Sequence, residues 1–343
     1  GIAAAFAGAS GGFSANLIVG AVDTLLSAIT TEAAALIEPG YVVNATDNWF
    51  FLMASTVLIV ALGTLITNKL VEPRLGKYTN DIQAETSTLN DKQRKALRWA
   101  NISVLAYIVL VVALCIPRGS FLRNAETGSL IEGAPLITGI VPLIALLFFI
   151  PGVVYGLVSK KYAGEKAVAG QLGDSMATMG SYIALSFFAA QFISYFGYTN
   201  LGTILAISGA KGLERSGLSG PVLMVLFVLF TAFINLFMGS ASAKWTILAP
   251  IFVPMFMLLG YSPELTQVAY RIGDSTTNII TPLMSYFAMI VVYVQKYDKK
   301  SGLGTLISTM LPYSIAFLVG WTILLVIWML LGLPLGPGAS FTY

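Results

Sequence analysis

The sequence lacks histidine, has a single cysteine and is poor in charged residues. Without histidine, the chain has neither the commonest metal ligand nor the commonest general base, which argues against zinc chemistry and Ser-His catalysis. Cys115 has no second cysteine with which to form a disulfide bond within the chain. Charged residues make up only 10% of the 343 positions, whereas a soluble domain has about a quarter. These absences argue against a soluble enzyme.

Apolar residues take the place of the missing charge. They make up 57% of the sequence, and the mean hydropathy is +0.82. This composition predicts an all-α, multi-pass membrane protein, because a spanning helix needs about 20 apolar residues. The length allows several spans with short loops, so we expect one membrane domain over residues 1–343. The chain opens at Gly1 without the charged region of a signal peptide, and we expect it either to begin within a larger protein or to have been processed.

Apolar runs divide the chain, and three of them contain polar interruptions. The runs cover residues 1–29, 49–68, 101–117, 137–158, 178–196, 219–260, 264–295 and 303–333. The interruptions lie at residues 10–16, 239–245 and 273–278. The run 219–260 is about twice as long as one crossing requires, which predicts a hairpin rather than a single span.

Basic residues assign sides to these runs, because short loops rich in Lys and Arg stay in the cytoplasm. Of the 19 basic residues, 13 lie in the loops 69–98, 159–167 and 296–301, which we therefore place inside. Loop 30–48 has none and is placed outside. This order is consistent only if 219–260 enters and leaves on the outer side. We therefore predict a re-entrant hairpin with its tip at 239–245.

The two interrupted helices, 1–29 and 264–295, then run in opposite directions. Their breaks align without gaps and match in three places: Gly11 with Gly273, Ser14 with Thr276, and Asn16 with Asn278. Oppositely oriented broken helices are typical of inverted-repeat transporters, in which half-helix ends and unwound backbone bind the solute or the coupling ion. A shared composition of small polar residues is the alternative explanation of the match.

Arg271 and Asp274 are the first candidates for a site, since charges at membrane depth are costly and commonly functional. They lie three positions apart, so on a helix they share a face and can pair. In the functional interpretation, Arg271 binds an anionic group of a solute and Asp274 binds a cation or a proton. In the structural interpretation, the two charges only neutralise each other within the bundle.

The residues at the two helix breaks carry a double interpretation as well. Thr276, Thr277 and Asn278 offer hydroxyl and amide oxygens to a ligand where the backbone opens. They can equally cap the broken ends, as such residues commonly do. Ser14 and Asn16 are their counterparts in the first broken helix, and the same two roles are open to them.

The hairpin tip and its surroundings complete the candidate set. Ser240 and Ser242 are small residues that permit close approach of the backbone. Trp245 can stack on an aromatic solute or lie at the membrane interface. Asp23 is either a proton or ion carrier or an interfacial acid, and Pro263 sets the turn between the hairpin and the broken helix.

These residues also carry a resemblance to a known family. The run GSASAKWTILAPIFVPMFMLLGYSPELTQVAYRIGDSTTNIITPLMSYF, the opening AAAFAGASGGFSANLIVGAVDTLL and the loop VEPRLGKY resemble the AbgT family of p-aminobenzoyl-glutamate transporters along the whole chain. The resemblance implies a homodimer with nine spans and two re-entrant hairpins per subunit, and a transport part that moves as an elevator. Family members have further spans and a first hairpin before the segment that matches Gly1.

The family's functional residues carry over to positions in this chain. Its acid after the first broken helix matches Asp23, and its hairpin serine and tryptophan match Ser242 and Trp245. Its proline, arginine and acid match Pro263, Arg271 and Asp274. The expected division of residues 1–343 is the end of the first repeat at 1–68, a cytoplasmic loop at 69–98, scaffold helices at 101–196, the hairpin at 219–260, the broken helix at 264–295 and the last span at 303–333.

The resemblance implies secondary active transport of p-aminobenzoyl-glutamate-like carboxylates, or export of sulfonamide antimetabolites, across the bacterial inner membrane. In this scheme Arg271 holds a carboxylate, Trp245 packs on the aminobenzoyl ring, and Asp274 with the broken-helix ends takes Na⁺ or H⁺. No other cofactor or metal and no nucleic acid is expected; the partners are membrane lipid, the solute and a second subunit. A passive anion channel is the alternative. An intramembrane aspartyl protease is disfavoured because RIGDS, which contains Asp274, lacks the second glycine of a GxGD motif.

Overall fold

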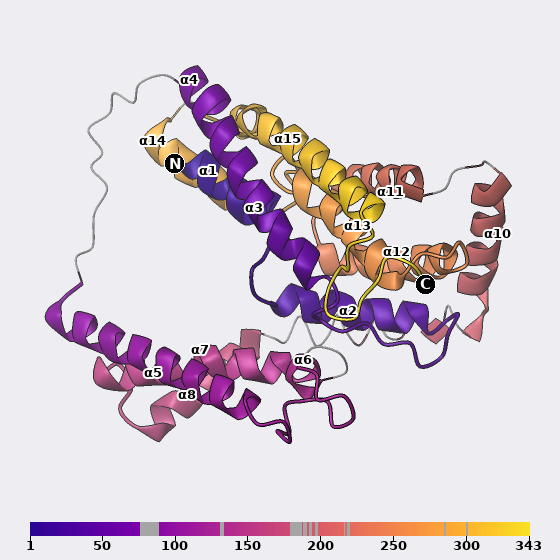
Figure 1. The fold of residues 1–343 in the computed structure, drawn as a ribbon. Helices are drawn as coiled ribbons and strands as arrows, with labels where there is room; N and C mark the ends of the chain where they lie inside the picture. Colours follow the sequence, from indigo (N-terminus) through magenta and orange to yellow (C-terminus); the bar gives the residue numbers. More distant parts are fainter. Residues whose placement is uncertain are drawn as a thin grey trace. The chain divides into compact units, whose positions relative to one another are not determined.

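The computed structural model describes residues 1–75, 89–130, 134–178, 187, 191, 194–195, 198–215, 217, 220–284, 286–299 and 301–343. Within these residues the regular secondary structure is helical, with two isolated β-bridges and no strand (Figure 1). This confirms the all-α prediction. The chain divides into two compact units: the first consists of Gly1–Ile82 and Ala189–Tyr343, and the second of Gln83–Phe188.

Four helices of the described part are long and apolar enough to cross a membrane. They are α3 (Trp49–Ile66) with its continuation through the π-helical turn η2 (Thr67–Val71) and α4 (Glu72–Leu75), α5 (Asp91–Cys115), α7 (Ile140–Val158) and α15 (Leu303–Leu330). They overlap the predicted runs 49–68, 101–117, 137–158 and 303–333. The predicted loop 69–98 was too long at both ends, because the first of these helices continues to Leu75 and α5 begins at Asp91. Most of the predicted span 178–196, and residues 76–88 of the predicted loop 69–98, lie outside the described residues.

The predicted hairpin consists of α11 (Gly220–Asn235) and α12 (Ala241–Met257). With 16 and 17 residues, each is shorter than the about 20 residues that a full crossing requires. The turn lies at 236–240, whereas the sequence predicted a tip at 239–245, so the prediction placed the tip too late. The helix resumes early because the hydroxyl of Ser240 caps it by accepting the N–H of Ala243 at 3.4 Å.

Both predicted broken helices are present, but the first break covers residues 12–20 instead of the predicted 10–16. The first consists of α1 (Ile2–Phe6), the π-helical turn η1 (Ala7–Gly11) and α2 (Ala21–Ala34), and the second of α13 (Pro263–Thr277) and α14 (Phe287–Tyr297). The second break begins at Asn278, so the predicted interruption at 273–278 was wrong for its first five residues. Thr276 and Thr277 remain helical, and their hydroxyls, which could otherwise compete for backbone groups, donate to carbonyls one turn back, those of Ile272 and Gly273, at 2.9 and 3.1 Å.

Helix α13 is the centre of the first unit. All of its residues are buried, and it packs against α2, α11, α12 and α15 (Figure 1). Gly273 permits the close approach of α11: a Cβ atom there would lie 1.9 Å from Thr231 Oγ1 and 2.5 Å from the carbonyl oxygen of Val228. The first break reaches the same place, since the backbone N–H of Ser14 donates to Ser275 Oγ at 3.2 Å. The two breaks therefore meet at the end of α13.

The remaining helices have simpler surroundings. In the first unit, α10 (Leu201–Arg215) packs against α12. In the second unit, α5 and α7 pack along each other, accompanied by α6 (Pro135–Thr138) and α8 (Glu165–Thr178). Large apolar side chains of this pair point outward: Leu105 is 63% exposed and Phe148 is 64% exposed. An apolar exterior of this kind suits contact with lipid.

Candidate functional site

Two buried ion pairs join α13 to its neighbours. Arg271 Nη1 lies 2.6 Å from Asp23 Oδ1 on α2, and Asp274 Oδ1 lies 2.7 Å from Lys244 Nζ on α12. The sequence suggested that Arg271 and Asp274 pair with each other, and in this respect the structure corrects it. Neighbouring helices supply each charge with its own opposite partner, which local spacing does not reveal. The two pairs fix the hairpin and both broken helices to one another.

Asp23 is held by three groups at the start of α2. Its Oδ2 accepts hydrogen bonds from the side-chain amide of Asn16 and from the backbone N–H of Gly20, both at 2.6 Å, while Oδ1 faces Arg271. The first turn of a helix favours a negative charge, because the helix dipole and its free N–H groups point there. The predicted residues Asn16 and Asp23 therefore lie together, and Asp23 lies beside Arg271.

Arg271 has unused hydrogen-bonding capacity. Its side chain is 1% exposed; Nη1 contacts the Asp23 carboxylate, whereas Nε and Nη2 have no hydrogen-bond partner within the described residues. A guanidinium carries five N–H donors, and leaving buried donors without acceptors is costly. This group can therefore accept a planar anion such as a carboxylate.

The Asp274 pair is embedded in a second polar cluster. Lys244 is fully buried and donates to Asn235 Oδ1 as well as to Asp274. The amide nitrogen of Asn235 lies within hydrogen-bonding distance of three acceptors: the carbonyl oxygen of Asp274 at 2.6 Å, and Thr277 Oγ1 and Asn278 Oδ1 at 2.9 Å each. Sequence reasoning missed Asn235; its signal is a lone amide in the apolar run FTAFINLF, which is uncommon at membrane depth.

The residues at the two breaks were given two roles, ligand binding and capping of the broken ends, and the structure distinguishes among them. The hydroxyl of Thr276 is used inside the helix, as described above, which favours a structural role. Thr277 and Asn278 belong to the Asn235 cluster beside Asp274. Ser14 contributes its backbone N–H rather than its hydroxyl to the meeting of the breaks. Thr277 and Asn278 therefore lie in the polar cluster beside the Lys244–Asp274 pair, although the hydroxyl of Thr277 also donates to Gly273 within α13.

Trp245 lies in the interior and not on an open wall. It is fully buried, its ring stacks on Tyr270 with centroids 4.4 Å apart, and its indole N–H donates to Thr30 Oγ1 at 2.9 Å. Pro263 begins α13 directly after Ser262, whose hydroxyl accepts the N–H of Leu265 at 3.2 Å. Pro263 therefore has the turn-setting position that its sequence context predicted.

A cavity of about 370 Å³ opens beside the hairpin tip. Ser240 and Ser242, both predicted site residues, line it together with Phe13, Val22, Leu25, Leu26, Gly239, Ala241, Leu283, Met284 and Tyr286. One wall is therefore apolar and comes from the first broken helix and the second break, while the other is the small polar tip. This combination suits an aromatic solute with polar substituents.

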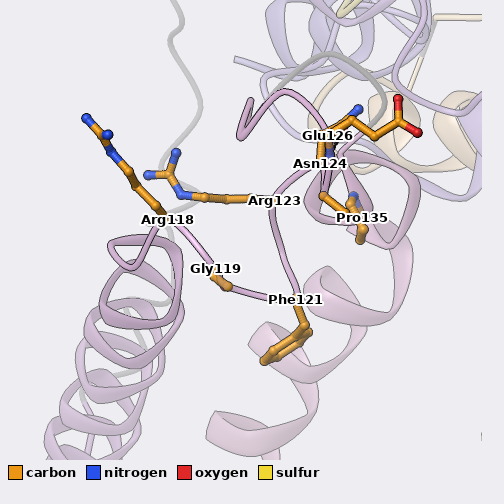
Figure 2. Close-up of a pocket in the computed structure, with 9 residues that line it drawn as sticks. Arg118, Gly119, Phe121, Arg123, Asn124, Glu126 and Pro135 are labelled. Atoms are coloured by element: carbon orange, nitrogen blue, oxygen red, sulfur yellow. Dashed lines mark hydrogen bonds between the residues drawn. The ribbon is translucent and has the colours of Figure 1, made fainter.

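A larger hollow, of about 680 Å³, lies in the second unit. Figure 2 shows Arg118, Arg123 and Glu126 among its lining residues, which belong to the loop between α5 and α6. The guanidinium of Arg123 donates to the carbonyls of Cys115 and Gly128, both at 2.8 Å, and so holds this loop together. The lining of the hollow includes none of the predicted site residues.

Acidic and tyrosyl groups cluster before α3 and at the start of α13. Tyr41 donates to the carboxylate of Glu264 at 3.1 Å, and burial together with the Glu264 charge raises the pKa of Tyr41. Burial also raises the pKa of Asp47 to about 6, although its hydrogen bonds from Asn44 oppose the rise. These groups lie in the predicted outer loop 30–48 or next to it.

Comparison with known proteins agrees with this architecture. The sequence matches the AbgT putative transporter family over residues 1–343. The p-aminobenzoyl-glutamate transport protein of Escherichia coli (strain K12) is 39% identical over 338 residues, which cover 98% of this chain and 66% of that protein. The chain thus spans just under two thirds of the length of this relative.

Two solved structures are similar in both sequence and fold. The YdaH transporter of Alcanivorax borkumensis is 47% identical with a TM-score of 0.93, and the match covers 98% of this chain and 71% of that one. MtrF of Neisseria gonorrhoeae, from a class of antimetabolite efflux pumps, is 49% identical with a TM-score of 0.89, covering 98% and 68%. These relatives are transporters and not enzymes. The chain belongs to the AbgT transporter family.

Proposed function

We propose that this chain carries the solute site of a secondary active transporter for aromatic-amide carboxylates of the p-aminobenzoyl-glutamate type. The observation that carries the proposal is the buried guanidinium of Arg271, which contacts Asp23 through Nη1 only and whose Nε and Nη2 have no hydrogen-bond partner within the described residues. A carboxylate of the solute would supply acceptors in the planar geometry that arginine favours. The named activity of the Escherichia coli relative gives the solute class.

The aryl ring of the solute would lie in the cavity beside the hairpin tip. Its apolar wall, which includes Phe13, Leu25 and Tyr286, suits a ring, and Ser240 and Ser242 can bond its polar substituents. Trp245, expected to pack on the ring, is enclosed by Tyr270 and Thr30 in this structure. In the proposal, Trp245 therefore stabilises the hairpin tip by packing in the interior, and the indole would have to turn before it could contact the aryl ring of the solute.

Charge balance supports coupling to a proton or sodium gradient. The site contains two acids, Asp23 and Asp274, and two bases, Arg271 and Lys244, so it is neutral when empty. A solute carboxylate that binds Arg271 competes with Asp23 and adds a buried negative charge, which is costly unless a cation enters too. We place the proton or Na⁺ at Asp274, where Thr277 and Asn278 offer further oxygens and where Lys244 would have to release the carboxylate as the cation binds.

The proposed setting is the bacterial inner membrane, where the chain works as a homodimer in contact with lipid. The direction of transport separates two versions of the function. Uptake is the version we propose for p-aminobenzoyl-glutamate, the solute in the name of the Escherichia coli relative. Export is the version we propose for antimetabolites of the sulfonamide type, since MtrF belongs to a class of antimetabolite efflux pumps. In both versions Arg271 binds the anionic group of the solute, a carboxylate in one and a sulfonamide in the other, and Asp274 is the coupling acid.

Transport of labelled p-aminobenzoyl-glutamate by protein reconstituted in vesicles tests the proposal. Arg271→Lys keeps the charge beside Asp23 but removes the planar fork, and we expect the half-saturating solute concentration to rise about tenfold, the equivalent of about 1.4 kcal/mol. Asp274→Asn should abolish the response to imposed pH or sodium gradients. Gradient-dependent flux that survives unaltered in Asp274→Asn would remove that residue from the mechanism.

Control measurements separate the alternatives. Vesicles of both orientations, loaded with p-aminobenzoyl-glutamate or with a sulfonamide, distinguish import from export. Single-channel current without gradient-coupled accumulation would favour a passive anion channel instead. Arg118→Lys, in the hollow of the second unit, provides a matched control, since that residue is exposed and we expect its variant to transport as the unmodified protein does.

A further inference from the structure

Thr30 is a fully buried residue of α2 at the junction of three helices. Its Oγ1 accepts the indole N–H of Trp245, on α12, at 2.9 Å. The same hydroxyl donates to the carbonyl of Leu26 at 2.7 Å and lies 3.0 Å from Oε1 of Gln267, on α13. A single hydroxyl therefore joins the first broken helix, the hairpin and the second broken helix.

Thr30 fixes the orientation of Trp245. A buried indole has one donor, its Nε1–H, and the structure gives that donor the Thr30 hydroxyl as its partner. With the nitrogen held there, the indole ring lies over Tyr270 at an interplanar angle of 28°. The hydrogen bond and the stacking together determine both the position and the tilt of the ring.

Tyr270 connects Trp245 to the charged site through its own contacts. Its hydroxyl donates to the carbonyl of Ala241, the first residue of α12 after the hairpin turn, and lies 3.4 Å from Asp274 Oδ1. Lys244, the partner of Asp274, lies 5.8 Å from the centroid of the same ring. A displaced Tyr270 ring would therefore move both the hairpin tip and the contacts of the Lys244–Asp274 pair.

We propose that Thr30 is a positioning residue for the transport site, acting through Trp245 and Tyr270 on the hairpin tip and Asp274. Without its hydroxyl, the indole N–H has no acceptor and Trp245 is free to turn away from Tyr270. The hairpin then loses the hydrogen bond that fixes the position of α12 along α2. The transport part of the test rests on the proposed function, whereas the structural part does not.

Thr30→Val and Thr30→Ser test the hydroxyl, because valine keeps the shape and serine keeps the oxygen. The emission of Trp245 is obtained in each background as the difference between the variant and the same variant carrying Trp245→Phe. We expect Thr30→Val to shift this emission to longer wavelength and to increase its quenching by acrylamide. Gradient-driven uptake of p-aminobenzoyl-glutamate should fall about tenfold, the equivalent of about 1.4 kcal/mol. Thr30→Ser should match the unmodified protein in both measurements.

A double-mutant comparison examines the route through Trp245. If Thr30 acts through the indole N–H, Thr30→Val should lower uptake no further in a protein that already carries Trp245→Phe. Fully multiplicative losses would overturn that route. If the valine variant does not fold, as judged by size-exclusion chromatography, Thr30→Cys replaces it with a similar volume and a weaker acceptor, and the same emission shift is expected.

Two further outcomes would overturn the proposal. One is an unchanged Trp245 emission and quenching in Thr30→Val. The other is a Thr30→Ser protein as defective as Thr30→Val, because the missing methyl group and not the hydroxyl would then be responsible. Absence of gradient-driven uptake by the unmodified protein would instead overturn the proposed transport function. The emission comparison needs no solute and would still decide the role of Thr30.

Discussion

Helices α13 and α7 make opposite use of polar and apolar residues. Every residue of α13 is buried, although the helix contains three charged side chains, those of Glu264, Arg271 and Asp274. Helix α7 is almost entirely apolar, yet Gly156 is its one buried residue among those whose burial is described, and Phe148 is 64% exposed. A soluble protein shows the reverse distribution. In a bilayer, lipid can solvate the apolar helix, and the polar one must find its partners within the protein.

The two helices therefore differ in what they require from their neighbours. Helix α7 needs length and apolarity, which its own sequence supplies. Helix α13 needs an acid from α2, a lysine from α12 and an amide from α11, namely Asp23, Lys244 and Asn235. Substitutions should consequently be costly around α13 and mild along α7. The predictions below test this difference, beginning with the largest expected effect.

Removal of one charge from the buried Lys244–Asp274 pair should have the largest effect on stability. Lys244→Met leaves Asp274 buried without its basic partner, which costs about 3–5 kcal/mol of unfolding free energy. Unfolding by denaturant in detergent measures the loss. Lys166→Met on the exposed surface of α8 serves as the matched control and should change stability by less than about 0.5 kcal/mol.

The double variant Lys244→Met with Asp274→Leu sharpens this test. Replacing both charges by apolar side chains removes the unpaired acid, so part of the lost stability should return. Transport would not return, since the proposed coupling residue is gone. Equal stability of Lys244→Met and the unmodified protein would show that the pair does not hold α12 against α13.

The second-largest difference between α13 and α7 is expected when a glycine is replaced by alanine. Gly273→Ala on α13 directs a Cβ atom to within 1.9 Å of Thr231 Oγ1 and close to the backbone of α11, so a loss toward the upper end of about 1–3 kcal/mol is expected. Gly152→Ala on α7 meets no atom within 4 Å and should be neutral or slightly stabilising. Thermal unfolding of both variants measures the contrast, and comparable losses in the two would contradict it.

The same contrast explains which parts of the fold the sequence predicts. Composition and run length are local properties, and they were sufficient for α3, α5, α7 and α15. The breaks were harder to place. Small and polar residues at 241–245 and 273–277 look like interruptions, but they are helical here. Ser240 caps the start of α12, and neighbouring helices bury residues 273–277. The sequence contains the residues of a break and not the packing that decides where it begins.

The candidate site shows a similar division. Arg271, Asp274 and Asp23 stand out because charged residues are rare in this chain, and Trp245 stands out because it lies in the small and polar stretch of the predicted hairpin tip. Their partners do not follow from spacing, since Asp23 and Arg271 are far apart in sequence and meet only when α2 packs against α13. Asn235 and Thr30 escaped notice because a lone amide or hydroxyl in an apolar run commonly bonds to its own helix. Only the tertiary fold reveals that both bridge between helices.

Asp47 extends the comparison to a polar group outside the spanning helices, where a smaller effect is expected. Burial raises its pKa from 3.8 to about 6, so the folded protein holds a proton that the unfolded chain releases at lower pH. Stability that this proton contributes is present below the unfolded pKa and is lost as pH rises through about 6. Between pH 5 and 7, the unfolding free energy of the unmodified protein should therefore fall by about 1.4 kcal/mol relative to Asp47→Asn, which does not titrate.

Asparagine suits this test because its side-chain oxygen can still accept the N–H of Asn44, which Asp47 Oδ2 now accepts at 2.6 Å. Chemical unfolding in detergent at pH 5, 6 and 7 gives the two curves. Glu126→Gln, an exposed acid of the second unit, provides the control and should run parallel to the unmodified protein. Parallel curves for Asp47→Asn as well would mean that Asp47 is solvated like an ordinary surface acid. Burial of a carboxyl without a basic partner would then be confined to the interior of the helix bundle.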